Sequence, residues 1–202
     1  MSQGRLGVFG GTFDPPHLGH LILAAEAHAQ LGLDRVLFVL TADPPHKRDH
    51  YITPVEDRLA MLAAAIKGQA IFELSRVEID RPGPHYAVDT LRLLAKEHQG
   101  NKLVYLIGGD SLRALSDWDR PQEFIAVCDA LAAMRRPGTR IDLDDLEQAL
   151  PGLTAKLEFV DAPLLEISSS EIRERVRDGG HYRFYLPGAV YQLINERGLY
   201  KN

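Results

Sequence analysis

The chain contains a single cysteine, Cys128, among its 202 residues, so it forms no internal disulfide bond. It has no run of the roughly 18 apolar residues that a membrane span requires, and its N-terminus lacks the long apolar region of a secretory signal. Positive charge is not in excess either, because 23 Lys and Arg residues face 28 Asp and Glu residues, a formal net charge of −5. A broad nucleic-acid footprint is therefore not expected. We expect a cytoplasmic protein that binds neither membrane nor nucleic acid, while the sequence leaves the oligomeric state open.

The sequence also lacks the Gly-x-Gly-x-x-Gly pattern after its first apolar run, which disfavours a dehydrogenase that binds a dinucleotide. There is no Gly/Ser-rich linker and no change in composition that would mark a domain boundary. We therefore predict one domain over residues 1–202, with a helical C-terminal part from about 165 to 202.

Apolar runs typical of buried strands alternate with segments of helical periodicity. Predicted strands cover Leu6–Phe9, Arg35–Leu40, Ile71–Ile79, Leu103–Ile107, Ala130–Met134 and Leu157–Val160. Predicted helices begin after His17, at Thr53–Glu56, and near Tyr86, Pro121, Asp142, Ser169 and Pro187. At the second helix Thr53 is expected to cap, with Pro54 in the first helical position and Glu56 completing a capping box. This order predicts an α/β fold with a doubly wound parallel sheet.

The most informative motif runs from Gly10 to His20 and reads Gly-Gly-Thr-Phe-Asp-Pro-Pro-His-Leu-Gly-His. It follows a strand and leads into a helix. Glycines let the backbone approach a ligand closely, and the amides at a helix start attract anions. His17 and His20 are three residues apart, so both rings can face one side of the first turn. The motif predicts a site for phosphate chemistry. Zinc is disfavoured because a catalytic zinc site needs a third protein ligand and none is obvious nearby.

A second motif, Ile167–Arg173, reads Ile-Ser-Ser-Ser-Glu-Ile-Arg. Ser168 and Glu171 form a capping-box pattern that places a helix start here. Serine hydroxyls, helix amides and the planar fork of Arg173 are together suited to polyphosphate. In a doubly wound sheet, ligands bind outside the carboxyl ends of the strands, where Gly10–His20, Pro44–Lys47 and Gly108–Asp110 also fall. We therefore predict one shared site.

These two motifs, in this order, resemble the nucleotidyltransferase superfamily, and within it the bacterial nicotinate-nucleotide adenylyltransferases. The resemblance covers essentially the whole chain. It extends to Pro44–Lys47, Tyr86 with Asp89–Leu91, Gly108–Leu112, Trp118, Arg135–Gly138 and Gly198–Tyr200. It implies a Rossmann-like nucleotidyltransferase fold.

The resemblance further implies an enzyme of NAD biosynthesis that joins AMP from ATP, brought with Mg²⁺, to the 5′-phosphate of nicotinate mononucleotide. The products would be deamido-NAD and pyrophosphate, without a covalent intermediate. The implied catalytic residues are His17 and His20, which the phosphates would keep in the charged, donating form. The implied ATP-binding residues are Gly10, Gly11, Thr12, Phe13, His17, His20, Gly108, Asp110, Ile167, Ser168, Ser169 and Arg173. The implied substrate-binding residues are Thr12, Phe13, Lys47, Tyr86, Thr90, Trp118 and Arg136, and no side chain is assigned to a metal.

Two positions depart from the family pattern. Ala87 stands where relatives commonly carry Thr, and Asp119 stands where they often carry an aromatic residue or His. A carboxylate next to Trp118, the residue expected to stack on the pyridine ring, would repel the nicotinate carboxylate. Nicotinamide mononucleotide, or another phosphorylated acceptor, is therefore the alternative substrate. Alternatives of other kinds are a nucleotide sensor without activity and a regulator that binds metal through His17, His20 and His46.

Overall fold

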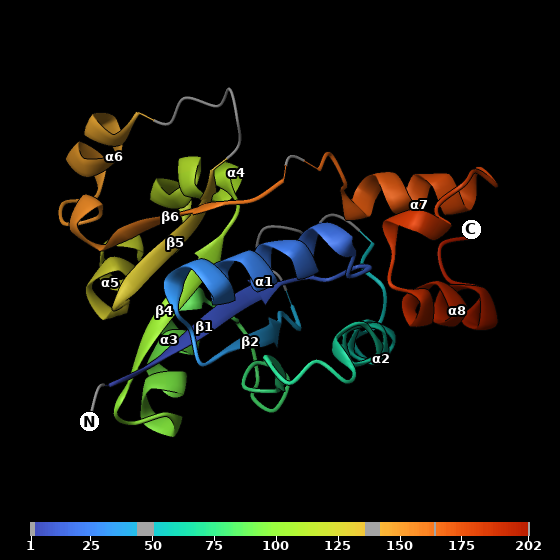
Figure 1. Ribbon diagram of the computed structural model, residues 1–202, viewed down its shortest axis with the longest axis horizontal. Coiled ribbons are helices and arrows are strands. Elements are labelled where there is room, and N and C mark those ends of the chain that lie inside the picture. Colours follow the sequence, from blue (N-terminus) through green and yellow to red (C-terminus); the bar gives the residue numbers. More distant parts are fainter. Residues whose placement is uncertain (1–2, 44–50, 136–141, 164, 202) are drawn as a thin grey trace.

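The computed structural model describes residues 3–43, 51–135, 142–163 and 165–201 (Figure 1). Its strands form one sheet of six strands in the order β3-β2-β1-β4-β5-β6, with every neighbouring pair parallel. The strands are β1 (Gly4–Gly11), β2 (Arg35–Leu40), β3 (Phe72–Ser75), β4 (Asn101–Ile107), β5 (Ala130–Arg135) and β6 (Leu157–Asp161). This is the strand order of a Rossmann-type sheet, and it confirms the predicted doubly wound parallel fold.

Helices cover both faces of this sheet (Figure 1). One face packs against α1 (Leu18–Leu31) and α2 (Val55–Ile66), and α7 (Ser169–Arg177) and α8 (Gly188–Arg197) add side chains to the same core cluster. The other packs against α3 (Ala87–Glu97), α4 (Gly109–Arg113), α5 (Pro121–Val127) and α6 (Leu143–Ala149). Single 3₁₀ turns lie at Leu115–Asp117, Thr154–Lys156 and Arg183–Tyr185. Within the described part of the chain, no helix has the length and apolar character needed to cross a membrane.

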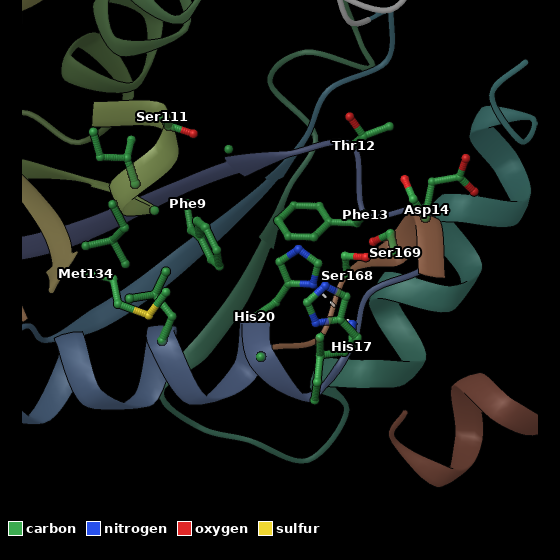
Figure 2. A pocket seen from close by; sticks show the side chains of 18 of the residues that line it. Phe9, Thr12, Phe13, Asp14, His17, His20, Ser111, Met134, Ser168 and Ser169 are labelled. Carbon is green, nitrogen blue, oxygen red and sulfur yellow. Dashed lines mark hydrogen bonds between the residues drawn. The ribbon is translucent and has the colours of Figure 1, made fainter. Parts of the chain in front are cut away.

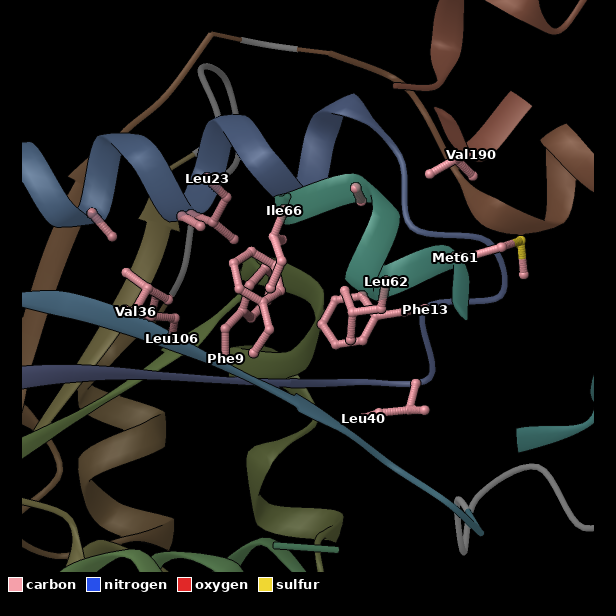
Figure 3. Packing of buried hydrophobic residues seen from close by; sticks show 14 of the residues in the cluster. Phe9, Phe13, Leu23, Val36, Leu40, Met61, Leu62, Ile66, Leu106 and Val190 are labelled. Carbon is pink, nitrogen blue, oxygen red and sulfur yellow. The ribbon is translucent and has the colours of Figure 1, made fainter. Parts of the chain in front are cut away.

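Alternation along β1 divides the core into two halves. Val8 points to the side of α3 and α5, whereas Phe9 points to the side of α1 and α2. Figure 3 shows Phe9 beside Ile66 and Phe13 beside Leu62 of α2, and the Phe9 and Phe13 rings lie 5.9 and 5.0 Å from that of His20 in the first turn of α1. Fully burying one such side chain contributes on the order of 2–3 kcal/mol to the free energy of unfolding. The loop after β1 is thus fixed by the core as well as by its own hydrogen bonds.

The neighbouring strands β1 and β4 form the switch point of the sheet, because the chain continues from β1 to one side and from β4 to the other. A crevice forms outside the carboxyl ends of strands at such a point. Gly10 and Gly11 end β1, and Gly108 directly follows β4. The glycine-rich segments found in the sequence therefore lie at the position where a doubly wound sheet binds its ligand.

The start of α2 differs from the prediction. Pro54 is the N-cap, helix α2 begins at Val55, and no side chain caps it. Thr53 is buried, and its backbone amide donates to Asp14 Oδ2 at 3.2 Å. The tertiary contact with Asp14 holds Thr53 against the loop after β1, so the expected capping box with Glu56 does not form.

Strand β3 is shorter than the predicted Ile71–Ile79, because pairing with β2 ends at Ser75. The next residues turn back on themselves, with the amides of Ile79 and Asp80 both donating to the Arg76 carbonyl. An ion pair between Arg76 and Asp80 at 2.8 Å spans the same turn. Local hydrogen bonds therefore replace the ladder at this edge of the sheet.

Candidate active site

His17 and His20 stack on each other where α1 begins. The ring centroids are 3.7 Å apart with an interplanar angle of 29°, and the backbone amide of His17 donates to His20 Nδ1 at 3.1 Å. Because Nδ1 of His20 accepts this bond, the neutral ring carries its proton on Nε2. The first turn of α1 therefore fixes which nitrogen of His20 acts as a donor.

His17 is the more deeply buried of the two rings, with 7% of its surface exposed. Its Nδ1 has no hydrogen-bond partner among the described residues. Burial lowers the pKa of His17 to about 4, so its ring is neutral near pH 7. The predicted charged form of His17 therefore depends on an anion that compensates for burial.

Phe13 holds His20 in place from the opposite side. Its ring meets the His20 ring edge-on at 5.0 Å and the Phe9 ring at 5.6 Å. Phe13 has a backbone φ of 47°, in the left-handed region that non-glycine residues rarely adopt. A Cβ atom on Gly11 would come within 2.9 Å of the Phe13 ring. Gly11 therefore makes room for Phe13, and it is not among the residues that line the pocket.

Asp14 connects three parts of the chain and is 4% exposed. Its Oδ1 accepts a hydrogen bond from the hydroxyl of Tyr200 at 2.7 Å, its Oδ2 accepts the Thr53 amide, and its backbone carbonyl accepts Arg173 Nη1 at 2.7 Å. The sequence alone predicted no role for Asp14. The only sequence feature that could have indicated one is an acid inside a motif otherwise built for anions.

The two predicted phosphate motifs meet directly. Ser169 Oγ donates to the Pro15 carbonyl at 2.8 Å, next to the bond between Arg173 and Asp14. Figure 2 shows His17 and His20 close to Ser168 and Ser169 at one end of the pocket. Ser168 Oγ caps α7 by accepting the Glu171 amide at 3.1 Å, whereas the Glu171 carboxylate pairs with Arg175 at 2.7 Å. Only half of the expected capping box forms, and the shared cleft that we predicted is present.

The cleft is a cavity of about 410 Å³ over the switch point of the sheet. Among the predicted residues, those lining it are Gly10, Thr12, Phe13, His17, His20, Gly108, Trp118, Ile167, Ser168, Ser169 and Arg173. It is also lined by residues to which the sequence gave no site role, which include Phe9, Asp14, Gly19, Tyr105, Ser111, Met134 and Ser170. Gly10 has no alternative here, because a Cβ atom would lie 2.6 Å from the hydroxyl oxygen of Tyr105.

Asp110, predicted to hold the ribose, lies in the first turn of α4 and pairs with Arg113. It is exposed and is not among the residues that line the cavity, so its role stays a prediction. The strand before this segment ends at Ile107 as predicted, and a short helix that the sequence did not predict begins at Gly109. Lys47 and Arg136, predicted as phosphate partners, lie outside the described residues.

Thr90 differs from its predicted role in substrate binding. It is 1% exposed, does not line the cavity, and donates its hydroxyl to Glu78 Oε1 at 2.6 Å. Burial raises the pKa of Glu78, and the hydrogen bond from Thr90 opposes this shift. Thr90 therefore holds helix α3 against the turn after β3 rather than reaching a ligand.

Trp118 and Tyr86, predicted for the pyridine ring, occupy different environments. Trp118 lines the cavity and packs against Tyr105 and Phe124, with ring centroids 6.1 and 5.3 Å away. Tyr86 is the N-cap of α3 and lies under the guanidinium group of Arg120 at 5.2 Å. Tyr86 is absent from the cavity lining, so its contact with substrate stays a prediction.

Arg58 is a buried charge that the sequence analysis missed. It is 1% exposed, and its guanidinium group donates to the carbonyls of Thr12, Thr41, Ala42 and Thr53 at 2.7–3.1 Å. Burial lowers the pKa of Arg58, and nearby Asp14 opposes this shift. Arg58 thus joins the loop after β1 to the loop after β2 from beneath the site. The only sign of this role in the sequence was an arginine directly before the apolar run that begins at Leu59.

No group of three or more His, Cys, Asp or Glu side chains suited to a metal ion occurs in the parts of the chain that the structure describes. Cys128 is buried, donates to the Ala130 carbonyl at 2.7 Å, and has a pKa raised to about 12 by burial. His46, part of the alternative metal site, lies outside the described residues.

A parallel 3-2-1-4-5-6 sheet with paired histidines and a Ser/Arg helix start around one cavity at its switch point defines a Rossmann-like nucleotidyltransferase. The model of the cytidylyltransferase-like family matches residues 8–175.

Related sequences show which family of nucleotidyltransferases the chain belongs to. The chain is 44% identical over 197 residues to a protein from Thermomicrobium roseum, covering 98% of this chain and 92% of the relative. It is 41% identical over 202 residues to a protein from Roseiflexus sp., covering both chains fully. Both carry the name "Probable nicotinate-nucleotide adenylyltransferase". The chain belongs to the nicotinate-nucleotide adenylyltransferase family, as its motifs predicted.

Solved structures support the fold. Nicotinic acid mononucleotide adenylyltransferase of Plasmodium falciparum complexed with NaAD superposes with a TM-score of 0.80 at 19% identity, covering 98% of this chain and 97% of that chain. The same enzyme complexed with APC gives a TM-score of 0.77 at 18% identity, with the same coverage of both chains.

Proposed function

We propose that this protein transfers AMP from ATP to the 5′-phosphate of nicotinate mononucleotide, releasing pyrophosphate and forming deamido-NAD. The observation that carries the proposal is the direct junction of the two phosphate motifs, through Ser169 to Pro15 and Arg173 to Asp14, around one cavity. Family membership agrees with this chemistry, since the relatives from Thermomicrobium roseum and Roseiflexus sp. are named for it.

The reaction requires little covalent chemistry from the protein. A phosphate oxygen of the mononucleotide attacks the α-phosphorus of ATP, and the bond from that phosphorus to the oxygen bridging to the β-phosphate breaks. The attacking oxygen is already anionic, so no base has to remove a proton. Catalysis then depends on positioning and on stabilising charge. Both tasks suit a cavity lined by His20, Arg173 and the start of α7.

Each phosphate donor has a defined place. His20 donates through Nε2, because its Nδ1 accepts the His17 amide. Arg173 is fixed by the Asp14 carbonyl at Nη1 and by Ser170 Oγ at 3.2 Å from Nη2. Donors held in advance cost no reorganisation when charge develops on the phosphates. We assign the triphosphate to this end of the cavity and the pyridine ring to the end at Trp118.

Magnesium enters as part of the substrate, in the complex that it forms with ATP. The polar side chains around the cavity are mainly hydrogen-bond donors, and Asp14, the one carboxylate among the described lining residues, already accepts bonds from Tyr200 and Thr53. This donor set fits phosphate oxygens rather than a resident metal ion. We further infer a cytoplasmic location, which the supply of ATP and the reduced, buried Cys128 support.

The test is a paired assay with ATP and magnesium, using nicotinate mononucleotide in one series and nicotinamide mononucleotide in the other. We expect pyrophosphate and deamido-NAD in equal amounts, and a higher kcat/KM for the acid. Pyrophosphate release without a dinucleotide product, or a clear preference for the amide, would contradict the proposed substrate.

A further inference from the structure

Two carboxylates lie next to Trp118, which lines the cavity. Asp117 and Asp119 flank this tryptophan in sequence, and both are exposed. A carboxylate close to the nicotinate carboxylate would weaken binding of the acid and leave the neutral amide unaffected. The chain therefore needs a compensating positive charge at this end if the acid is its substrate.

Arg120 supplies a guanidinium group that is fixed from two sides. Its Nη2 and Nη1 bond to Asp89 Oδ2 and Oδ1 at 2.6 and 3.1 Å, and its Nε bonds to Asp119 Oδ1 at 2.6 Å. These bonds raise the pKa of Arg120, and the bond from Arg120 is the largest cause of the lowered pKa of Asp89. A bidentate hydrogen bond to one carboxylate and a single hydrogen bond to another fix both the position and the plane of the guanidinium group.

The same guanidinium group joins the two segments that carry the predicted pyridine contacts. Arg120 is the N-cap of α5, two residues after Trp118, and Asp89 lies in the first turn of α3, three residues after Tyr86. The guanidinium carbon also lies 5.2 Å from the centre of the Tyr86 ring. Arg120 has a φ of 49°, and such a left-handed conformation is unfavourable for a non-glycine residue. The surrounding contacts hold Arg120 in this unfavourable conformation at the margin of the cavity.

Charge balance at this margin depends on Arg120. Arg92 also contacts this cluster, with Nη1 3.5 Å from Asp89 and Nη2 2.6 Å from Glu123. Among the groups joined here by ion pairs, the three carboxylates of Asp89, Asp119 and Glu123 face two guanidinium groups, a net charge of −1, and Arg81 also acts electrostatically on Asp89. Removing the charge of Arg120 would make it −2 and would leave Asp119 without its guanidinium partner.

We propose that Arg120 is a specificity-determining residue, which neutralises Asp119 and Asp89 beside the pyridine end of the cavity and thereby sets the preference for the acid mononucleotide over the amide. This inference rests on the proposed function. Arg120 does not line the cavity and acts through its charge. Loss of the Arg120 charge should therefore change the ratio of kcat/KM for the acid mononucleotide to kcat/KM for the amide, because the two substrates differ in one charge.

The experiment measures kcat/KM for nicotinate and nicotinamide mononucleotide in the wild type, Arg120→Gln, Asp119→Asn and the double variant. We expect Arg120→Gln to lower the acid-to-amide ratio about fivefold, as suits a partly exposed charge. Asp119→Asn added to Arg120→Gln should restore most of the ratio, because it removes the carboxylate that repels the acid. The difference between wild type and Arg120→Gln should shrink at 1 M salt.

Two further variants separate charge from structure. Arg35→Gln removes an arginine of similar exposure, which pairs with Glu73 at 2.9 Å. Because Arg35 lies at the start of β2, at the opposite end of the strands from the cavity, the acid-to-amide ratio of this variant should match that of the wild type. Arg120→Lys keeps the charge but loses the planar fork, so it should keep most of the ratio even where both kcat/KM values fall.

The outcomes are distinct. An equal loss for both mononucleotides in Arg120→Gln, without rescue by Asp119→Asn, would overturn the inference and leave Arg120 a structural link between α3 and α5. An unchanged ratio in an active Arg120→Gln would overturn it as well, while the proposed function stands. Wild-type protein that forms no dinucleotide from either substrate would overturn the proposed function and this inference with it.

Discussion

At the scale of single residues, the left-handed backbone conformation marks the site. In the described part of the chain it occurs at three non-glycine residues, which are Phe13, Arg120 and Tyr200. Phe13 packs on His20, Arg120 binds Asp119, and Tyr200 binds Asp14. Strained residues persist where the surrounding contacts hold them, and they concentrate at functional sites. Phe13 lines the cavity, Tyr200 binds Asp14 in its lining, and Arg120 binds the neighbour of Trp118.

His20→Ala should lower kcat at least a hundredfold, because a donor to developing charge is typically worth on the order of 3–4 kcal/mol. The measurement is steady-state turnover with both nucleotides saturating, beside the circular dichroism spectrum of the folded protein. His28→Ala, in the last turn of the same helix, is the matched control and should keep its turnover. Near-normal turnover of His20→Ala would contradict the assignment of His20.

His17 should make stability depend on pH. Its pKa is lowered to about 4 in the folded protein against about 6.5 in the unfolded chain, so between these values only the unfolded chain binds the proton. The free energy of unfolding should therefore rise with pH through this window, by about 2 kcal/mol from pH 4.5 to pH 7. His17→Gln should lose this contribution, while the carboxylates common to both proteins cancel. Urea unfolding at the two pH values checks this, and equal pH dependence in both proteins would contradict it.

At the scale of elements, the site depends on links between loops that no single helix or strand contains. Helix α2 reaches the loops after β1 and β2 through Arg58, and helix α7 reaches the loop after β1 through Ser169 and Arg173. Backbone carbonyls accept most of these bonds, so the loops are held by their main chain. Their side chains remain able to face the cavity.

Arg58→Met should lower the free energy of unfolding by about 3–5 kcal/mol, because four buried carbonyls lose their donor. Arg58→Lys should recover only part of the loss, since one ammonium group does not reach carbonyls on three segments. Urea unfolding of both variants tests the expectation. Full recovery with Lys would show that the charge matters and the fork does not.

At the scale of the whole molecule, the C-terminal end closes the structure around the N-terminal motif. Helices α7 and α8 add Ile172, Val176, Val190 and Ile194 to the core beneath α1 and α2. Tyr200, near the end of the chain, then donates to Asp14 near its beginning. Burial is the largest cause of the strongly raised pKa of Tyr200, so the hydroxyl stays protonated and remains a donor.

Tyr200→Phe should lower the free energy of unfolding by about 1–3 kcal/mol, because the buried Asp14 carboxylate loses a hydrogen bond. For a chain of this length that corresponds to a melting temperature lower by roughly 2–12 °C. Tyr182→Phe is the matched control, since the Tyr182 hydroxyl donates to Asn195 at 3.0 Å in a more exposed position. Scanning calorimetry compares the two, and equal shifts would contradict the role given to Asp14.

Much of the site could be predicted from local sequence, because glycines, histidines and a serine cap act within one loop or one helical turn. The sequence of β1 and its motif predicted the strand, the helix start and the paired imidazoles, and the Ser168 cap predicted α7. Strand character and helical periodicity likewise predicted the doubly wound sheet.

Other features were decided only when distant segments came together. The sequence suggested a helix cap at Thr53 and a ligand contact at Thr90, but burial drew their polar groups to Asp14 and Glu78. Arg58 and Asp14 looked ordinary in the sequence, and they became central because their partners lie up to 186 residues away along the chain. Local conformational preference depends on neighbouring residues, whereas the partner of a buried charge depends on the packing of the whole chain.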